Sequence, residues 1–149
     1  MAMGRVEKTE DPIPTNLDES IEFLKRKIPA GELEEFKNLP ERRAVGATHH
    51  GIGMHLRNTW GLWSGSELKD WFLERGVWHA DDMSGIIIKS FHRVLNDKPI
   101  ELEKQISFYF YKKYWDAHQT AEENGMSLRV QIEDGELKIE AEKDEEQDV

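Results

Sequence analysis

Residues 46–95 read GATHHGIGMHLRNTWGLWSGSELKDWFLERGVWHADDMSGIIIKSFHRVL, and this stretch decides the fold. It holds four of the five tryptophans, five of the six histidines and seven of the eleven glycines. Tryptophan fills a large, rigid volume in a core, whereas glycine permits close backbone approach or a positive φ. Their concentration here predicts a tightly packed unit but does not by itself indicate a chemistry.

Composition restricts the class of protein. The chain has 149 residues, the usual size of one domain, and no cysteine, which excludes disulfides, thiolate metal sites and a cysteine nucleophile. Of the net charge of −10, half comes from the last ten residues, EAEKDEEQDV, whose six acids and one lysine give −5. Without a basic stripe, a membrane-length apolar run or an apolar leader segment, we expect a cytoplasmic protein that binds neither nucleic acid nor membrane.

The hydrophobic pattern predicts a mainly α protein: a single compact domain of about six helices with a C-terminal β-hairpin. We expect a disordered segment at 1–13, a helical domain over 14–123, the hairpin at 126–142 and an acidic tail at 143–149. The hairpin prediction rests on two alternating apolar runs that Asp134-Gly135 separates, the strongest short-range hairpin signal.

Local signals predict where individual helices begin and how closely they pack. Thr15 is expected to cap the first helix, and His79 the helix that opens with Ala80-Asp81-Asp82. A third helix is expected to run from Pro40 to Gly61 with one continuous apolar stripe. Glycines 46, 51 and 53 lie inside it, at a cost of about 0.5–1 kcal/mol each relative to alanine, which indicates that another helix packs very close.

Three strings carry a family resemblance: His50-Gly51-Ile52-Gly53, then LRNTWGLW at 56–63, then HADDMS at 79–84. With the lead-in at 13–17, they are similar to a family of small uncharacterised bacterial helical domains. In that family an HxGxxxRNxWGLW-like helix precedes a Tyr-His-Pro-Asp-Asp-Met-Ser element and an Ile-rich helix. The resemblance covers about residues 13–116; Trp78 replaces the family's Tyr and Ala80 its Pro. It implies a fold but no activity, since none is assigned to the family.

The histidines and acids allow a catalytic interpretation. His50, His79, Asp81 and Asp82 could converge on a metal, with Arg57 binding an anion, as in a metal- or anion-dependent hydrolase. However, helical phosphohydrolases place His directly before Asp, and the H-E-x-x-H spacing is absent. The structural interpretation makes these residues caps, dipole partners and core groups, and under it we expect no metal and no cofactor.

Arg57 and the tryptophans favour a binding function. A buried arginine needs a partner, so we expect Arg57 to form a bidentate bridge with a buried Asp81 or Asp82, as a structural strut or as an anion-binding group. Of the tryptophans at 60, 63, 71 and 78, one or two should lie at the surface, and exposed Trp beside Arg is typical of a protein-binding hot spot. The candidate binding residues are therefore Arg57, Trp63 and Trp78.

The absence of a catalytic motif, the acidic surface and the surplus aromatics together favour a non-enzymatic protein-interaction module, of an inhibitor or immunity type. Its expected partner is another protein with a basic surface. The alternative is the hydrolase built from the His, Asp and Arg cluster. The identity of the partner and the oligomeric state do not follow from the sequence.

Overall fold

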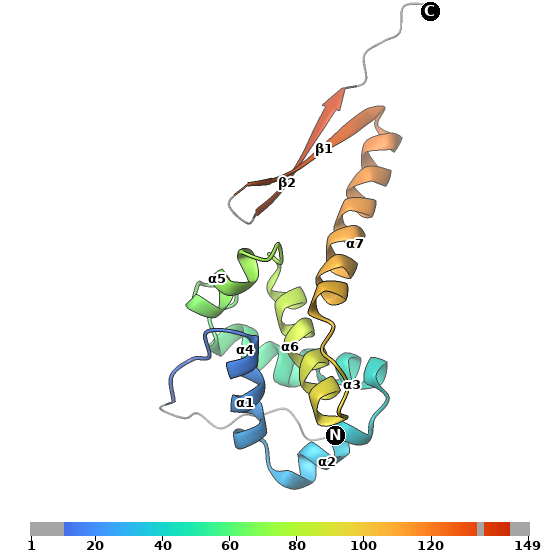
Figure 1. Cartoon of the computed structure of the whole chain (residues 1–149). Helices are drawn as coiled ribbons and strands as arrows, with labels where there is room; N and C mark the ends of the chain where they lie inside the picture. Colours follow the sequence, from blue (N-terminus) through green and yellow to red (C-terminus); the bar gives the residue numbers. More distant parts are fainter. Residues whose placement is uncertain (1–10, 134–135, 144–149) are drawn as a thin grey trace, which may run out of the picture.

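The computed structural model describes residues 11–133 and 136–143 (Figure 1). Over these residues, six continuous helical segments precede a two-stranded antiparallel sheet, with the three adjoining elements over residues 41–59 counted as one segment. This architecture confirms the expected mainly α fold with a C-terminal hairpin. Residues 1–10 of the segment expected to be disordered (1–13), the expected turn at 134–135 and residues 144–149 of the expected tail (143–149) lie outside the described residues. The elements are α1 Leu17–Lys27, α2 Ala30–Asn38, α3 Glu41–Thr48, η1 His49–Gly53, α4 Met54–Thr59, α5 Glu67–Leu73, α6 Ala80–Leu95, α7 Leu102–Glu123, β1 Met126–Glu133 and β2 Glu136–Lys143.

Side chains at the helix starts explain several of these boundaries. Asn16 Oδ1 accepts the backbone N–H of Glu19 at 2.8 Å and caps α1, so the expectation of Thr15 was wrong by one residue. The Thr15 hydroxyl instead donates to the Glu19 carboxylate at 2.8 Å. The predicted His79 cap of α6 is confirmed: Nδ1 accepts the backbone N–H of Asp81 at 3.0 Å. These bonds satisfy N–H groups that a helix start leaves without an intrahelical partner.

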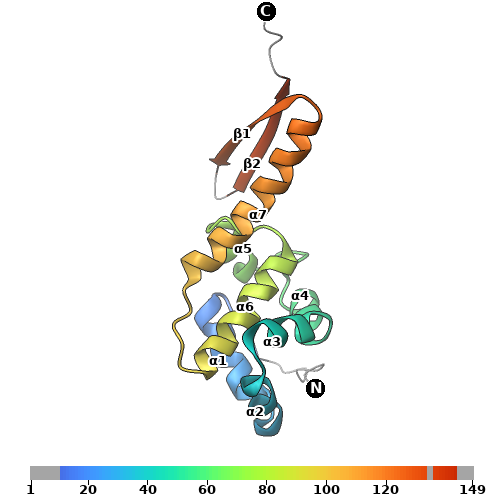
Figure 2. The same cartoon turned by 90° about the vertical axis from the view of Figure 1, so that its right-hand side faces the viewer.

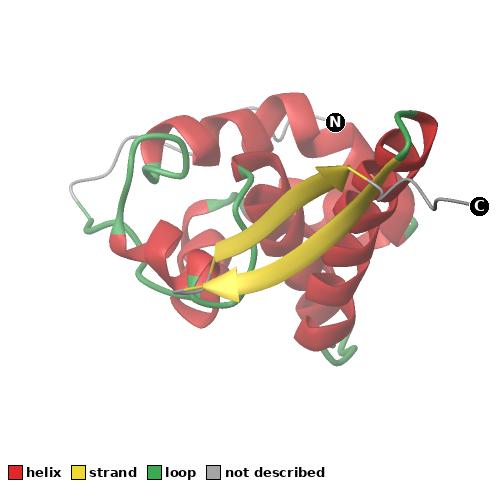
Figure 3. Cartoon of the chain, turned by 90° about the horizontal axis from the view of Figure 1, so that it is seen from above, coloured by secondary structure: helices red, strands yellow, loops and turns green. Residues whose placement is uncertain are grey.

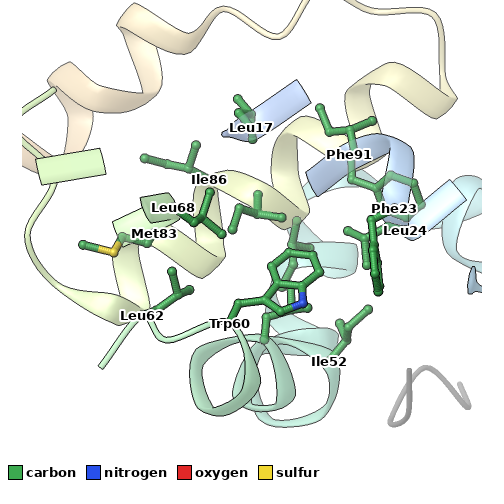
Figure 4. Close-up of a cluster of buried hydrophobic side chains, with 14 of the residues drawn as sticks. Leu17, Phe23, Leu24, Ile52, Trp60, Leu62, Leu68, Met83, Ile86 and Phe91 are labelled. Carbon is green, nitrogen blue, oxygen red and sulfur yellow. The ribbon is translucent and has the colours of Figure 1, made fainter. Parts of the chain in front are cut away.

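Helix α6 lies at the centre of the fold and contacts α1 to α5, η1 and α7 (Figure 2). Its apolar side chains form the middle of the core, and Figure 4 shows them among residues of α1, η1 and α5. Three small buried residues, Ser84, Gly85 and Ser90, let neighbouring elements approach. At Gly85 an added Cβ would lie 2.8 Å from the Tyr109 hydroxyl, so glycine here permits the packing of α7 on α6.

The segment from α3 to α4 departs from the regular helix that its apolar stripe predicted. A π-helical turn, η1, interrupts it at His49–Gly53. The preceding Thr48 hydroxyl donates to the Ala44 carbonyl at 2.8 Å, a back-bond that competes with regular helical geometry. Close approach occurs at Gly53, whereas Gly46 faces open space, so the expectation for Gly46 was wrong.

The C-terminal half of α7 and the hairpin extend away from the other helices (Figures 1 and 2). Strand β1 pairs with β2 in a register that runs from Met126 opposite Lys143 to Glu133 opposite Glu136. The pair packs on α7 mainly through β1, and Figure 3 looks down on it from above. This contact supplies the support that an isolated two-stranded hairpin lacks. Over the described residues, no helix combines the length and apolar character needed to cross a bilayer.

Candidate functional site

Arg57 is the centre of the candidate site. It lies on α4 with only 5% of its surface exposed. Its Nη1 donates to Ser84 Oγ at 2.8 Å, its Nη2 donates to the His49 carbonyl at 3.0 Å, and its Nε lies 3.3 Å from Asp81 Oδ1. The expected ion pair with Asp81 is therefore present, but it is not bidentate and its carboxylate is not buried, because Asp81 is 43% exposed. One guanidinium fork thus ties α4 to both η1 and α6.

Gly53 makes room for this fork. A Cβ at position 53 would lie 3.0 Å from Arg57 Nη1 and 3.2 Å from the Thr48 carbonyl oxygen. Both distances are tighter than ordinary contact, so a side chain here would displace the guanidinium or the backbone. The glycine within the π-helical turn and the buried arginine one turn later therefore form one structural unit.

An aromatic patch lies beside the Asp81 end of the fork. The Trp63 ring meets the His79 ring edge-on, with centroids 5.4 Å apart and planes at 81°. His79 Nδ1 lies 3.7 Å from Asp81 Oδ2, which links the pair of rings to the Arg57 ion pair. Trp63 is 52% exposed, and the side chains of His79 and Asp81 are each more than 40% exposed. We call Trp63, His79 and Asp81 the Trp63 patch.

The other tryptophans of residues 46–95 are less accessible. Trp60 is buried, with its ring edge-on to Phe23 at 5.3 Å. Trp71 is half-buried, and the Arg75 guanidinium lies 3.8 Å from its ring centroid. Trp78 is half-buried directly before His79. One of the four, Trp63, is exposed, which confirms the expectation that one or two would reach the surface.

The groups of the hydrolase alternative do not form one cluster. Arg57, His79 and Asp81 lie together, but the exposed His50 packs edge-on against His49, with ring centroids 4.9 Å apart. Burial raises the pKa of Tyr109, and the negative charge of Asp82 raises it further. Within the described part of the chain, no three His, Asp or Glu side chains converge as metal ligands.

A second candidate site was not foreseen from the sequence. A cleft of about 250 Å³ lies between α3, α6 and α7, and we call it the α7 cleft. The sequence signal for it is Phe108, an aromatic residue directly before the inward-facing Tyr109 on α7. In the structure Phe108 is 62% exposed. The lining residues are Glu41, Arg42, Val45, Lys89, Gln105, Phe108 and Tyr109.

The fold and the Arg57 fork define a small helical domain organised around one central helix. The profile of a family described as a domain of unknown function, DUF6794, matches residues 13–95. The chain therefore belongs to this uncharacterised family. The match runs from the lead-in of α1 to the end of α6, so α7 and the hairpin lie beyond it. No curated protein and no solved structure matches the chain.

Proposed function

We propose that this chain is a non-enzymatic protein-interaction module, of an inhibitor or immunity type, that binds its partner through the Trp63 patch. One observation supports this most directly: Trp63 is 52% exposed while its ring rests edge-on against His79. A large aromatic that is exposed but already held loses little conformational entropy on binding, and tryptophan is enriched in binding hot spots. We include the half-buried Trp78, which directly precedes His79 in the chain, in the proposed binding surface.

Arg57 has a supporting role in this proposal. All three of its nitrogen atoms face partners within the domain, and only 5% of the residue is exposed. It therefore fixes the position of Asp81, whose carboxylate remains accessible beside the aromatic rings. An arginine that is buried and engaged through each of its three nitrogens is a poor candidate for direct contact with a partner or a substrate anion.

The proposed partner presents a basic surface. An arginine or lysine of the partner could lie over the Trp63 indole while its charge approaches Asp81, which combines a cation–π contact with an ion pair. The chain carries a net charge of −10, so a basic partner would also be attracted at longer range. Such steering accelerates association and weakens as salt is added.

The hydrolase alternative gains no support from the described residues. His79 Nδ1 is engaged as the cap of α6, and Asp81 faces Arg57. The ring of His50 packs against that of His49. A metal would need several of these side chains to converge, and a substrate anion would need Arg57 to be free.

Comparative affinity capture tests the proposal. The wild-type chain, Trp63→Ala and Trp115→Ala are used as baits in extracts of the cells that produce the protein. Trp115 is a matched control, since it is 58% exposed but lies on α7. We expect a protein that wild type and Trp115→Ala retain and Trp63→Ala loses, and that binds directly when purified.

The proposal fails if no retained protein depends on Trp63, or if Trp115→Ala loses the same proteins. The purified chain also separates the two functions. A near-equimolar bound metal, together with a melting temperature that chelator lowers, would favour the hydrolase, because a ligand that binds only the native state stabilises it.

A further inference from the structure

The α7 cleft is small. Its volume of about 250 Å³ is below the 300–1,000 Å³ of typical sites for small organic ligands. A space of this size suits one or two side chains of a peptide instead. It lies between α3, α6 and α7, away from the Arg57 fork between α4, η1 and α6, and shares no lining residue with the Trp63 patch.

The rim of the cleft is positively charged. Among the described residues, neither Arg42 nor Lys89 has a hydrogen-bond or ion-pair partner. The one acidic lining residue, Glu41, is already paired, since Arg93 Nη1 lies 2.9 Å from its Oε1. Two free cations therefore border this cleft in a chain whose net charge is −10. By charge complementarity the rim favours an acidic occupant.

The cleft also offers apolar contact. Phe108 is 62% exposed on α7, and the half-buried Val45 faces the cleft from α3. The neighbouring Tyr109 packs against Gly85 of α6 and forms a firm wall. An exposed aromatic ring beside a cleft favours an occupant with an apolar side chain, because covering the ring removes apolar surface from water.

A buried amide in the wall lacks a hydrogen-bond donor. Gln105 is 4% exposed, and its Nε2 donates to Ser90 Oγ at 3.1 Å and to the Ile100 carbonyl at 2.9 Å. Because a carbonyl can only accept, the bond to Ile100 fixes the orientation of the amide. Gln105 Oε1 has no partner among the described residues.

We propose that the α7 cleft binds an acidic peptide segment of a partner protein, one that also carries an apolar side chain. The carboxylates of the segment pair with Arg42 and Lys89, and its apolar side chain packs against Phe108 and Val45. This site is separate from the Trp63 patch, so it stands or fails independently of the proposed function. It also differs in the required partner chemistry, which is acidic here and basic at the Trp63 patch.

Fluorescence anisotropy with the full chain tests this site. The probe is a fluorescein-labelled peptide that repeats Glu-Glu-Leu; a Lys-Lys-Leu repeat tests charge and a Glu-Glu-Ser repeat tests the apolar requirement. We expect the Glu-Glu-Leu probe to bind at least about tenfold more tightly than either comparison peptide, with an affinity that decreases as salt is added. Failure of the wild-type chain to bind this probe, or equal binding of the Lys-Lys-Leu repeat, would overturn the proposal.

Matched variants locate the binding. The Arg42→Glu, Lys89→Glu double variant and Phe108→Ala should each weaken probe binding at least about tenfold. The controls Arg43→Glu, on the same helix as Arg42, and Trp115→Ala, on the same helix as Phe108, should stay within about twofold. Circular dichroism verifies the fold of each variant. If the charge-reversed double variant unfolds, the neutral Arg42→Gln, Lys89→Gln double variant is used in its place. Equal losses in the controls would contradict the assignment.

A further arm identifies the source of the acidic segment. An unlabelled peptide of residues 140–149, EAEKDEEQDV, is added as a competitor, and the mass of the full chain is measured over a range of concentrations. With a partner protein as occupant, we expect the full chain to remain monomeric and the competitor to be weak. Strong competition, together with a dimer that the Arg42→Glu, Lys89→Glu variant abolishes, would replace the partner protein by a second copy of this chain.

Discussion

Replacement of Arg57 by alanine should destabilise the domain far more than replacement of its ionic partner. Arg57 is 5% exposed, whereas the Asp81 side chain is 43% exposed. The arginine is therefore the buried member of the pair, contrary to the sequence-based expectation of a buried carboxylate. We expect Arg57→Ala to cost about 2–4 kcal/mol and Asp81→Ala no more than about 1 kcal/mol.

The magnitude follows from the three contacts of the guanidinium. Loss of this donor removes a hydrogen bond from a charged group to the part-buried His49 carbonyl, and such bonds contribute about 1.5–3 kcal/mol. Ser84 loses less, because its hydroxyl keeps its bond to the Asp81 carbonyl at 3.1 Å. The partly exposed ion pair adds only about 0.2–1 kcal/mol. The buried stem of the arginine adds a packing loss that Asp81→Ala does not share.

Urea denaturation, followed by tryptophan fluorescence and circular dichroism, measures both effects. A double-mutant cycle compares wild type, Arg57→Ala, Asp81→Ala and the double variant. We expect a coupling energy below about 1 kcal/mol for the Arg57–Asp81 pair. If Asp81→Ala costs as much as Arg57→Ala, or if Arg57→Ala costs less than about 1 kcal/mol, the assignment of Arg57 as a buried strut is refuted.

Three further predictions concern the core, one turn and the α6–α7 contact. Trp60→Ala should cost about 3–5 kcal/mol because this ring is 5% exposed, while the exposed Trp63→Ala should cost less than about 1 kcal/mol; similar losses in urea unfolding would contradict the packing. Gly61→Ala should lower the melting temperature, because φ at Gly61 is +66° and an added Cβ would lie 2.5 Å from the Gly65 carbonyl oxygen. Gly46→Ala should raise the melting temperature, because position 46 faces open space, and the reverse order of the two variants would refute this reasoning. The raised pKa of Tyr109 keeps its phenol protonated in the folded state above pH 10.0, where the unfolded chain releases the proton, so the free energy of unfolding should fall as the pH rises above that value. Tyr109→Phe should reduce this fall in an alkaline titration of stability, and an unchanged slope would contradict the prediction.

Local sequence determined much of the helical framework. The predicted helix end at Gly61 is confirmed by a glycine with positive φ, and the predicted cap at the start of α6 is formed by His79. These features depend on residues that are close in sequence, so hydrogen-bonding capacity and φ preference suffice to predict them. The Arg57–Asp81 pair was also predictable as chemistry, because a buried arginine requires a partner.

The shared roles of side chains were decided only by the tertiary structure. Nothing local indicates that Arg57 also holds the His49 carbonyl of a π-helical turn, or that Gly85 is needed because Tyr109 of α7 packs on it. The α7 cleft likewise requires α3, α6 and α7 to meet, and those segments are far apart in sequence. Periodicity predicts which face of a helix is buried but not which helix covers it, since that depends on the simultaneous packing of the whole core.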